Sequence, residues 1–205
     1  MIEFNDLDTG YEQCIGIYNT VTTTGESITS RLSQTIDALT IHWLGEDATK
    51  HVNSLVKVHS EIASFIKATV EVMADTTEKV VQVQEARESN GATNASVGTT
   101  VARDIEIPAK AEIPGTIKYF CDQEARQDHE NLVQLIDDFK TFSENVERDS
   151  DELMSNWISG NGRQKAQEQF DGFKNASNGY YQVMVETASA LDKAVSNLEQ
   201  LMTNN

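Results

Sequence analysis

The stretch Ile41-His42-Trp43-Leu44-Gly45-Glu46-Asp47-Ala48 decides the fold, because one regular hydrophobic pattern stops there and another starts. A second stretch of the same kind, Asn156-Trp157-Ile158-Ser159-Gly160-Asn161-Gly162, follows much later in the chain. The two tryptophans of the chain lie in these stretches, each within three residues of a glycine. Glycine adopts backbone conformations that other residues avoid, which lets a chain reverse tightly. Both stretches are therefore predicted to be turns between helices.

Apolar and small residues on both sides of Trp43 recur in alternating steps of four and three. This heptad spacing is typical of helices that pack at a shallow angle. It predicts one helix over residues 6–40 and a second over residues 46–86, joined by the turn as an antiparallel hairpin. The predicted core positions are Leu7, Tyr11, Cys14, Tyr18, Val21, Gly25, Ile28, Leu32 and Leu39 in the first helix, and Ala48, Val52, Leu55, His59, Ile62, Ile66, Thr69, Met73, Thr77, Val80 and Gln84 in the second.

The ends of these helices and one weak point can also be predicted. Asn5 or Asp6 can cap the start of the first helix. Glu46 and Asp47 stand at the start of the second, where negative charge is favoured. Residues 20–25 read Thr-Val-Thr-Thr-Thr-Gly, and β-branched residues and glycine disfavour helix. We expect local bending at this segment, held in place by tertiary packing.

The second half of the chain repeats the pattern. A helix is predicted from about Pro114 to Trp157, and another from the Gly162 turn to the C-terminus, with a soft point at residues 178–179. Two hairpins, each with one apolar face, are expected to pack face to face as an all-α four-helix bundle, a pseudo-dimer within one chain. The predicted core positions are Ile117, Phe120, Glu124, Leu132, Leu135, Phe139, Phe142, Val146, Leu153, Trp157, Ala166, Phe170, Phe173, Ser177, Tyr180, Met184, Thr187, Leu191, Ala194, Leu198 and Leu201.

The predicted domains are a first hairpin over 1–86, a linker over 87–113 and a second hairpin over 114–205. The linker begins with small polar residues, over 89–100, that predict flexible chain. Residues 104–114 alternate polar and apolar side chains and contain both prolines of the chain. This part is predicted to be extended, with a groove of the bundle as one place for it.

The net charge of −17 excludes several classes of partner. Nucleic-acid binding needs lysine and arginine against phosphate, and anionic membrane surfaces repel a chain this acidic. No stretch approaches the length of about 20 apolar residues that a membrane span needs. The first ten residues do not resemble a signal peptide. We therefore expect no nucleic-acid partner and no membrane insertion, with the acidic residues solvating long helix faces.

No catalytic or metal-binding set stands out. Cys14 and Cys121 lie among apolar residues and are expected to be buried free thiols. His51 and His59 are too far apart along one helix for an i, i+4 metal pair. No Ser/His/Asp or Cys/His set and no glycine-rich phosphate loop is apparent. The sequence thus predicts a protein that is not an enzyme and that holds no metal and no cofactor.

The first turn, Trp43-Leu44-Gly45, is followed by Ala48 and Val52 at helical spacing. With these residues the chain resembles the WXG100, or ESAT-6-like, family of helical hairpins, which type VII secretion systems of Gram-positive bacteria and mycobacteria handle. The second turn, Trp157-Ile158-Ser159-Gly160, departs from the motif by one additional residue. Family members work as dimers of separate hairpins, so the resemblance implies that this chain is a fused pair and a monomer.

The resemblance also implies a function, which is protein–protein recognition associated with virulence. It implies secretion without an N-terminal signal peptide through a type VII-like route, with a secretion ATPase, another WXG100-like protein or an effector as partner. Trp43, Gly45, Trp157 and Gly160 are the candidate recognition residues, since aromatic residues beside turns are typical binding anchors. The alternative is that each ring packs over its own turn. The family's Tyr-x-x-x-Asp/Glu export signal is not found, because Val185 stands four residues after Tyr181.

Two other functions remain open at this stage. A cytosolic helical scaffold or adaptor that binds a partner helix would have the same heptad pattern and the same acidity. A membrane-active bundle that opens toward lipid is the third hypothesis, but the negative charge and the thin apolar stripe count against it.

Overall fold

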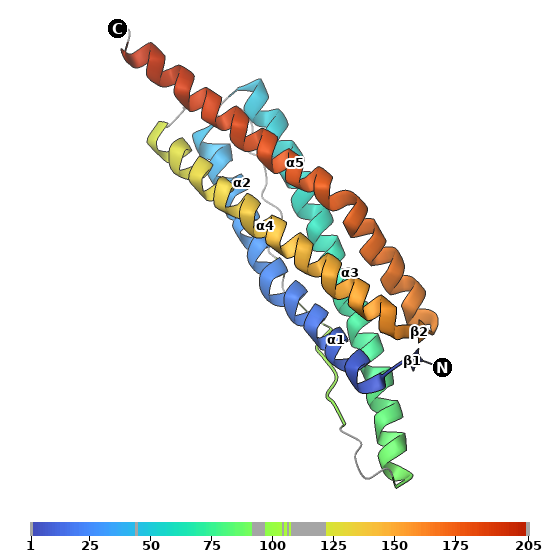
Figure 1. Cartoon of the computed structure of the whole chain (residues 1–205). Helices are drawn as coiled ribbons and strands as arrows, with labels where there is room; N and C mark the ends of the chain where they lie inside the picture. Colours follow the sequence, from blue (N-terminus) through green and yellow to red (C-terminus); the bar gives the residue numbers. More distant parts are fainter. Residues whose placement is uncertain are drawn as a thin grey trace. The chain divides into compact units, whose positions relative to one another are not determined.

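The computed structural model describes residues 2–43, 45–91, 97–103, 105, 107 and 122–203. These residues are almost entirely helical, which confirms the predicted all-α class (Figure 1). The elements in chain order are β1 (Glu3–Phe4), α1 (Leu7–Asn19), the π-helix η1 (Thr20–Gly25), α2 (Glu26–His42), α3 (Glu46–Ser89), α4 (Asp122–Asn156), β2 (Trp157–Ser159) and α5 (Asn161–Thr203).

The first helix starts at the predicted cap. Asp6 has extended backbone angles, and its carboxylate accepts a hydrogen bond of 2.9 Å from the backbone N–H of Thr9. That backbone hydrogen bond lowers the pKa of the Asp6 carboxyl, because it stabilises the charged form. The cap satisfies one of the backbone donors that every helix start leaves without a partner.

The predicted weak point at residues 20–25 is the π-helix η1. Gly25, at its end, is buried, and a Cβ atom there would lie 2.9 Å from the Cδ1 atom of Ile66 and 3.3 Å from the ring of Phe142. The absence of a side chain at Gly25 therefore lets Ile66 and Phe142 pack against the backbone. Packing holds the irregular segment in place, as the sequence predicted.

The described helices contribute to two compact units, each a helical bundle. Unit 1 contains residues 1–26, 64–106 and 142–175, and unit 2 contains residues 27–63, 107–141 and 176–205. Each unit thus draws segments from both halves of the sequence. The predicted division into hairpins at 1–86 and 114–205 stays a prediction.

Each unit has an aromatic and aliphatic core. In unit 1 the rings of Phe65 and Phe173 stack with centroids 4.0 Å apart, and Phe142 meets Phe173 edge-on at 5.7 Å. In unit 2 the ring of Phe139 meets Tyr180 edge-on at 6.3 Å. Removal of these side chains from water is the main favourable contribution to folding. Burial raises the pKa of the Tyr180 hydroxyl to about 12, and neighbouring Glu61 adds to this effect.

The predicted heptad stripe holds best along α3, where every predicted core position is buried. It is wrong in the first described turns of α4, where Glu124 is exposed and Ala125 and Asp128 are buried instead. A small alanine can face the core at this place, whereas a glutamate carboxylate there would have to leave water. Helix α5 runs unbroken through residues 178–179, the predicted soft point. Ile117 and Phe120 lie outside the described residues.

Both predicted turns are present. Gly45 and Gly160 have φ angles of +109° and +128°, which other residues rarely adopt. The second turn also holds a strand pair that the sequence did not predict, in which Phe4 is paired with Trp157 and Glu3 with Ser159. The all-α class therefore includes one small antiparallel sheet.

Part of the predicted linker makes specific contacts in the structure, whereas flexible chain over 89–100 stays a prediction. Residues 97–103, named the strap below, belong to unit 1, where they contact α1 and α3. The hydroxyl of Tyr11 donates to the carbonyl of Thr99 at 2.8 Å and accepts from its N–H at 2.7 Å. The N–H of Gly98 donates to the side chain of Gln84 at 3.1 Å. These specific bonds, which a local polar composition does not reveal, fix the strap.

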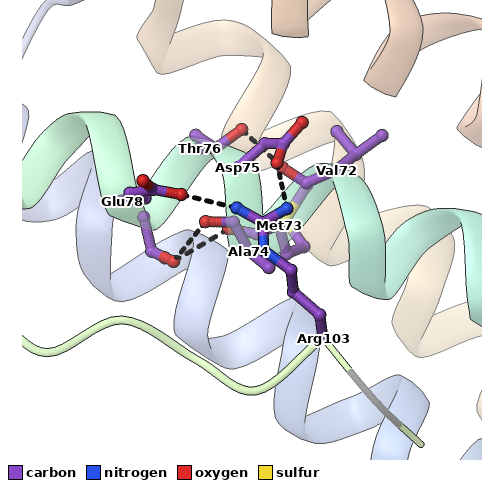
Figure 2. A network of polar contacts seen from close by, with 8 residues as sticks. Val72, Met73, Ala74, Asp75, Thr76, Glu78 and Arg103 are labelled. Atoms are coloured by element: carbon purple, nitrogen blue, oxygen red, sulfur yellow. Dashed lines mark hydrogen bonds and ion pairs between the residues drawn. The ribbon is translucent and has the colours of Figure 1, made fainter.

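The strap ends in an ion-pair cluster on α3 (Figure 2). The guanidinium of Arg103 reaches the carboxylates of both Asp75 and Glu78, which stand one helical turn apart. Figure 2 shows the arginine side chain rising from the strap toward these two acids. Of the predicted extended part, 104–114, only Ile105 and Ile107 are described, and both are half-buried outside any helix or strand.

Candidate functional site

Trp157 is enclosed at the turn between α4 and α5. Its ring is 1% exposed and stacks on Phe4, with centroids 5.3 Å apart. The indole N–H donates to the carbonyl of Ser159 at 3.0 Å. A Cβ atom at Gly162 would come within 3.1 Å of the ring, so the backbone of α5 passes close to its far edge. The ring is thus part of the turn and is not presented to solvent.

Asn156 fixes this turn to the start of the chain, and Arg163 holds the turn to the end of α4. The amide of Asn156 donates to the carbonyl of Asp6 at 3.0 Å, and its oxygen accepts from the N–H of Asp6 at 3.0 Å. The guanidinium of Arg163 donates to the carbonyls of Trp157 and Met154. Carbonyls at the end of a helix have no partner within it, so these bonds satisfy groups that would otherwise need water.

A groove of about 940 Å³ lies beside this turn, within unit 1. We name it the Trp157 groove. Its lining combines apolar side chains from the strand pair with one face of the last turns of α3 and with the first residues of α5. The lining includes Phe4, Lys79, Val83, Ala86, Arg87, Trp157, Asn161 and Gly162.

Trp43 is likewise buried at its own turn, in unit 2. Its ring is 3% exposed and stacks on the imidazole of His51, with centroids 5.7 Å apart. The N–H of Thr49 donates to the carbonyl of Gly45 at 3.1 Å, which starts α3. A second groove of about 730 Å³, the Trp43 groove, is lined by Trp43, Asp47 and His51 together with α5 residues that include Val185, Glu186, Ser189 and Lys193.

The structure therefore brings together the predicted site residues in two pairs. Trp43 and Gly45 share one turn in unit 2, and Trp157 and Gly160 share another in unit 1. Both rings pack over their own turns, which was the alternative to presenting them directly to a partner. Partner recognition by these four residues stays a prediction.

The sequence reasoning missed the exposed apolar residues beside the two turns. Ile41 is 58% exposed and Ile158 is 55% exposed. Ile41 stands two residues before Trp43 and Ile158 directly follows Trp157, and large apolar side chains on the surface are candidate contacts for a partner. The exposure of Ile41 could have been predicted from the sequence, because Ile41 is apolar and falls outside the heptad stripe of its helix.

The structure describes three of the four cysteine and histidine residues that the sequence analysis considered, Cys14, His51 and His59. Cys14 is fully buried, and burial raises the pKa of its thiol to about 12, so the reactive thiolate is scarce. Cys121 lies outside the described residues. His59 is buried at its predicted core position in α3, and His51 contacts Trp43. In the part of the chain that the structure describes, no three His, Cys, Asp or Glu side chains gather as they would around a metal ion.

None of the described helices is both long and apolar enough to cross a membrane.

Comparison with known proteins identifies no relative: no family model, no curated protein and no solved structure matches the chain.

Proposed function

We propose that this chain is a non-enzymatic recognition protein of a type VII-like secretion pathway, a tandem WXG100-like substrate or carrier. One observation carries the proposal: a buried tryptophan followed by a glycine with positive φ, between two long helices, occurs twice in one chain. Trp43 precedes Gly45 between α2 and α3, and Trp157 precedes Gly160 between α4 and α5. The first turn carries the Trp-x-Gly motif of the family resemblance, and the second carries it with one additional residue between Trp157 and Gly160.

The proposal includes the finer architecture of two antiparallel hairpins packed as a four-helix bundle. Short connections support it, since α3 begins at Glu46 soon after α2 ends at His42, and α5 begins at Asn161 soon after β2. Helices joined by so few residues are usually antiparallel neighbours. The buried stripe of α3, which runs from Ala48 to Gln84, supports packing along most of this helix.

The proposed mechanism is recognition by the turn surfaces, without covalent chemistry. Buried Trp43 and Trp157 shape the two turns, and exposed Ile41 and Ile158 offer apolar contacts beside them. Apolar anchors that become buried in an interface contribute a large part of its binding energy. The predicted partners are a secretion ATPase, another WXG100-like protein or an effector.

The test is export from a Gram-positive host that carries a type VII system. A tagged chain is expected in the culture medium, and deletion of the secretion ATPase should abolish its export. Ile41→Asp and Ile158→Asp should each reduce export or capture by the ATPase by about tenfold, because each buries a charge in the proposed interface. Val133→Asp is the control, since Val133 is an apolar residue of α4 that is 41% exposed and does not neighbour either turn in the sequence.

Retention of the protein in the cytosol, beside a co-expressed family member that is exported normally, would overturn this proposal. The second candidate, a cytosolic scaffold or adaptor that binds a partner helix, would then take its place. The Trp157 groove fits recognition of a protein partner under either candidate, because it leaves one face of the last turns of α3 open.

A further inference from the structure

The Trp157 groove carries positive charge on a chain whose net charge is −17. Lys79 and Arg87 line it from α3, and neither forms an ion pair with another described residue. Glu3, the acidic residue of the lining, accepts a hydrogen bond of 2.7 Å from the hydroxyl of Ser159. The groove therefore has two cations without an ion-pair partner among the described residues, and the Glu3 carboxylate, which keeps its charge, is held at Ser159.

The start of α5 adds to this positive field. Gly160, Asn161 and Gly162 line the groove, so the start of α5 forms part of its wall. The first turn of α5 contains no acidic residue, whereas α3 begins with Glu46 and Asp47. Helix N-termini favour negative charge. Two features of the groove thus favour a negatively charged ligand: the two basic side chains and the start of α5, which has no acidic residue in its first turn.

Apolar surface completes the groove. Val83 and Phe4 are half-buried and Ala86 is exposed, beside the buried ring of Trp157. Figure 1 shows the last turns of α3 continuing past β1 and β2, so this face of the helix extends beyond the strand pair. A chain segment laid along these turns would remove apolar side chains from water while placing its own acidic groups near the cations.

We propose that the Trp157 groove binds an acidic, apolar segment of a partner protein, with carboxylates at Lys79 and Arg87 and an apolar side chain against Phe4 and Val83. This inference deepens the proposed recognition function and rests on it. The two cations stand eight residues apart on α3, or about 12 Å along the helix axis. The partner segment should therefore carry two acidic groups separated by a similar distance, which corresponds to about four residues of extended chain.

The charge of the whole protein selects among anionic ligands. A polyanion such as nucleic acid or an anionic membrane surface would meet the repulsion of the net charge of −17. Salt screens charges over a distance of about 10 Å. A short peptide in the groove is therefore attracted mainly by Lys79 and Arg87, and the more distant acidic residues of the protein repel it little. A peptide segment also matches a groove that offers both apolar and basic surface.

The experiment selects peptides from a random displayed library on the purified full chain. Enriched sequences should pair Asp or Glu with aromatic or aliphatic residues, and synthetic copies should bind in fluorescence anisotropy. The double variant Lys79→Glu/Arg87→Glu should weaken binding by about tenfold or more, since two charge-assisted contacts are lost. Lys50→Glu/Lys67→Glu is the matched control, because it makes the same charge change at exposed positions of α3 outside the groove.

Several outcomes would overturn the proposal: no enrichment of acidic residues, equal binding after Lys79→Glu/Arg87→Glu, or equal loss in the matched control. Binding of oleate in place of peptide, with the same dependence on Lys79 and Arg87, would also overturn it and assign the groove to lipid. Because this assay measures binding in solution, it can succeed when export fails and fail when export succeeds. The two proposals are therefore tested separately.

Discussion

The imidazole Nδ1 of His42 lies 2.7 Å from the carboxylate Oδ2 of Asp128, and this contact joins the end of α2 to the start of α4 within unit 2. The Asp128 side chain is only 7% exposed. Burial raises the pKa of its carboxyl, while the hydrogen bond from His42 acts in the opposite direction and the charge of Glu124 raises it further. A buried acid with one polar partner is a place where stability should depend on pH.

The first prediction concerns the sign of that dependence. A carboxyl whose pKa is raised in the folded state binds a proton more tightly there than in the unfolded chain. Its contribution to stability is therefore greatest at acidic pH and decreases as the pH rises through the folded-state pKa. Asp128→Asn removes the titration and keeps an acceptor for His42. The free energy of unfolding of the wild type, minus that of Asp128→Asn, should fall as the pH rises from about 4 to 7, measured by urea unfolding.

Asp128→Ala provides the comparison. It leaves the half-buried imidazole without its acceptor and should cost about 1–3 kcal/mol at pH 7. A stability difference between wild type and Asp128→Asn that stays constant, or that rises with pH, would contradict the raised pKa of Asp128.

The second prediction compares the effect of alanine substitution on stability at two glycines, Gly16 in α1 and Gly25 in η1. A Cβ atom at Gly25 would lie 2.9 Å from Ile66 and 3.3 Å from Phe142, whereas at Gly16 it would meet no atom within 4 Å. Gly25→Ala should therefore destabilise the protein by about 1–3 kcal/mol through overpacking. Gly16→Ala should stabilise it by about 0.5–1 kcal/mol, because alanine is the better helix former. Urea unfolding of both variants measures the difference.

Gly172→Ala serves as a second control in α5, since it too is exposed with nothing nearby. If Gly25→Ala is as stable as Gly16→Ala, the close packing of Ile66 and Phe142 at η1 is not what holds that segment.

Much of the fold could be predicted because its signals are local and repeated. The apolar stripe of α3 recurs over most of the helix, so one wrong position would not have changed the prediction of a helix there. The turn at Gly45 and the cap at Asp6 depend on residues within a few positions of each other. Where the repeat was weak, at Glu124, the predicted position was wrong by one residue and Ala125 faces the core.

The remaining features depend on residues that are distant in sequence. Strand β1 has only two residues and therefore shows no periodicity that could predict it. It nevertheless pairs with β2 at Trp157, which is far away in the sequence. The strap is fixed by Tyr11 and Gln84 through single hydrogen bonds. For the candidate site, the tryptophan positions were predictable, but their burial and the exposure of Ile41 follow from packing that the heptad pattern alone does not specify.

The third prediction concerns the buried thiol. Cys14 is fully buried, and its pKa of about 12 leaves very little thiolate at neutral pH. In a Cys121→Ser background, a thiol reagent such as DTNB should therefore react with the native protein more slowly than with the urea-unfolded protein by about a thousandfold or more. Reaction at the rate of an exposed cysteine peptide, without loss of helical circular dichroism, would show that the thiol is accessible in the folded state.

The fourth prediction concerns the strap. A Cβ atom at Gly98 would lie 2.2 Å from the ring of Tyr11, so Gly98→Ala forces the ring to move. Movement of the ring breaks both hydrogen bonds between the Tyr11 hydroxyl and Thr99. The strap should then open more often, and exchange of the N–H groups of Gly98 and Thr99 should be faster by about tenfold or more, as measured by hydrogen exchange.

Thr100→Val is the control, because Thr100 is an exposed residue of the strap and the substitution only replaces a hydroxyl with a methyl group of similar size. Arg103→Ala should have a smaller effect than Gly98→Ala, since exposed ion pairs such as those with Asp75 and Glu78 contribute about 0–1 kcal/mol each. If Arg103→Ala opens the strap more than Gly98→Ala does, the ion-pair cluster in Figure 2 is the main attachment of the strap and the Tyr11 bonds are secondary.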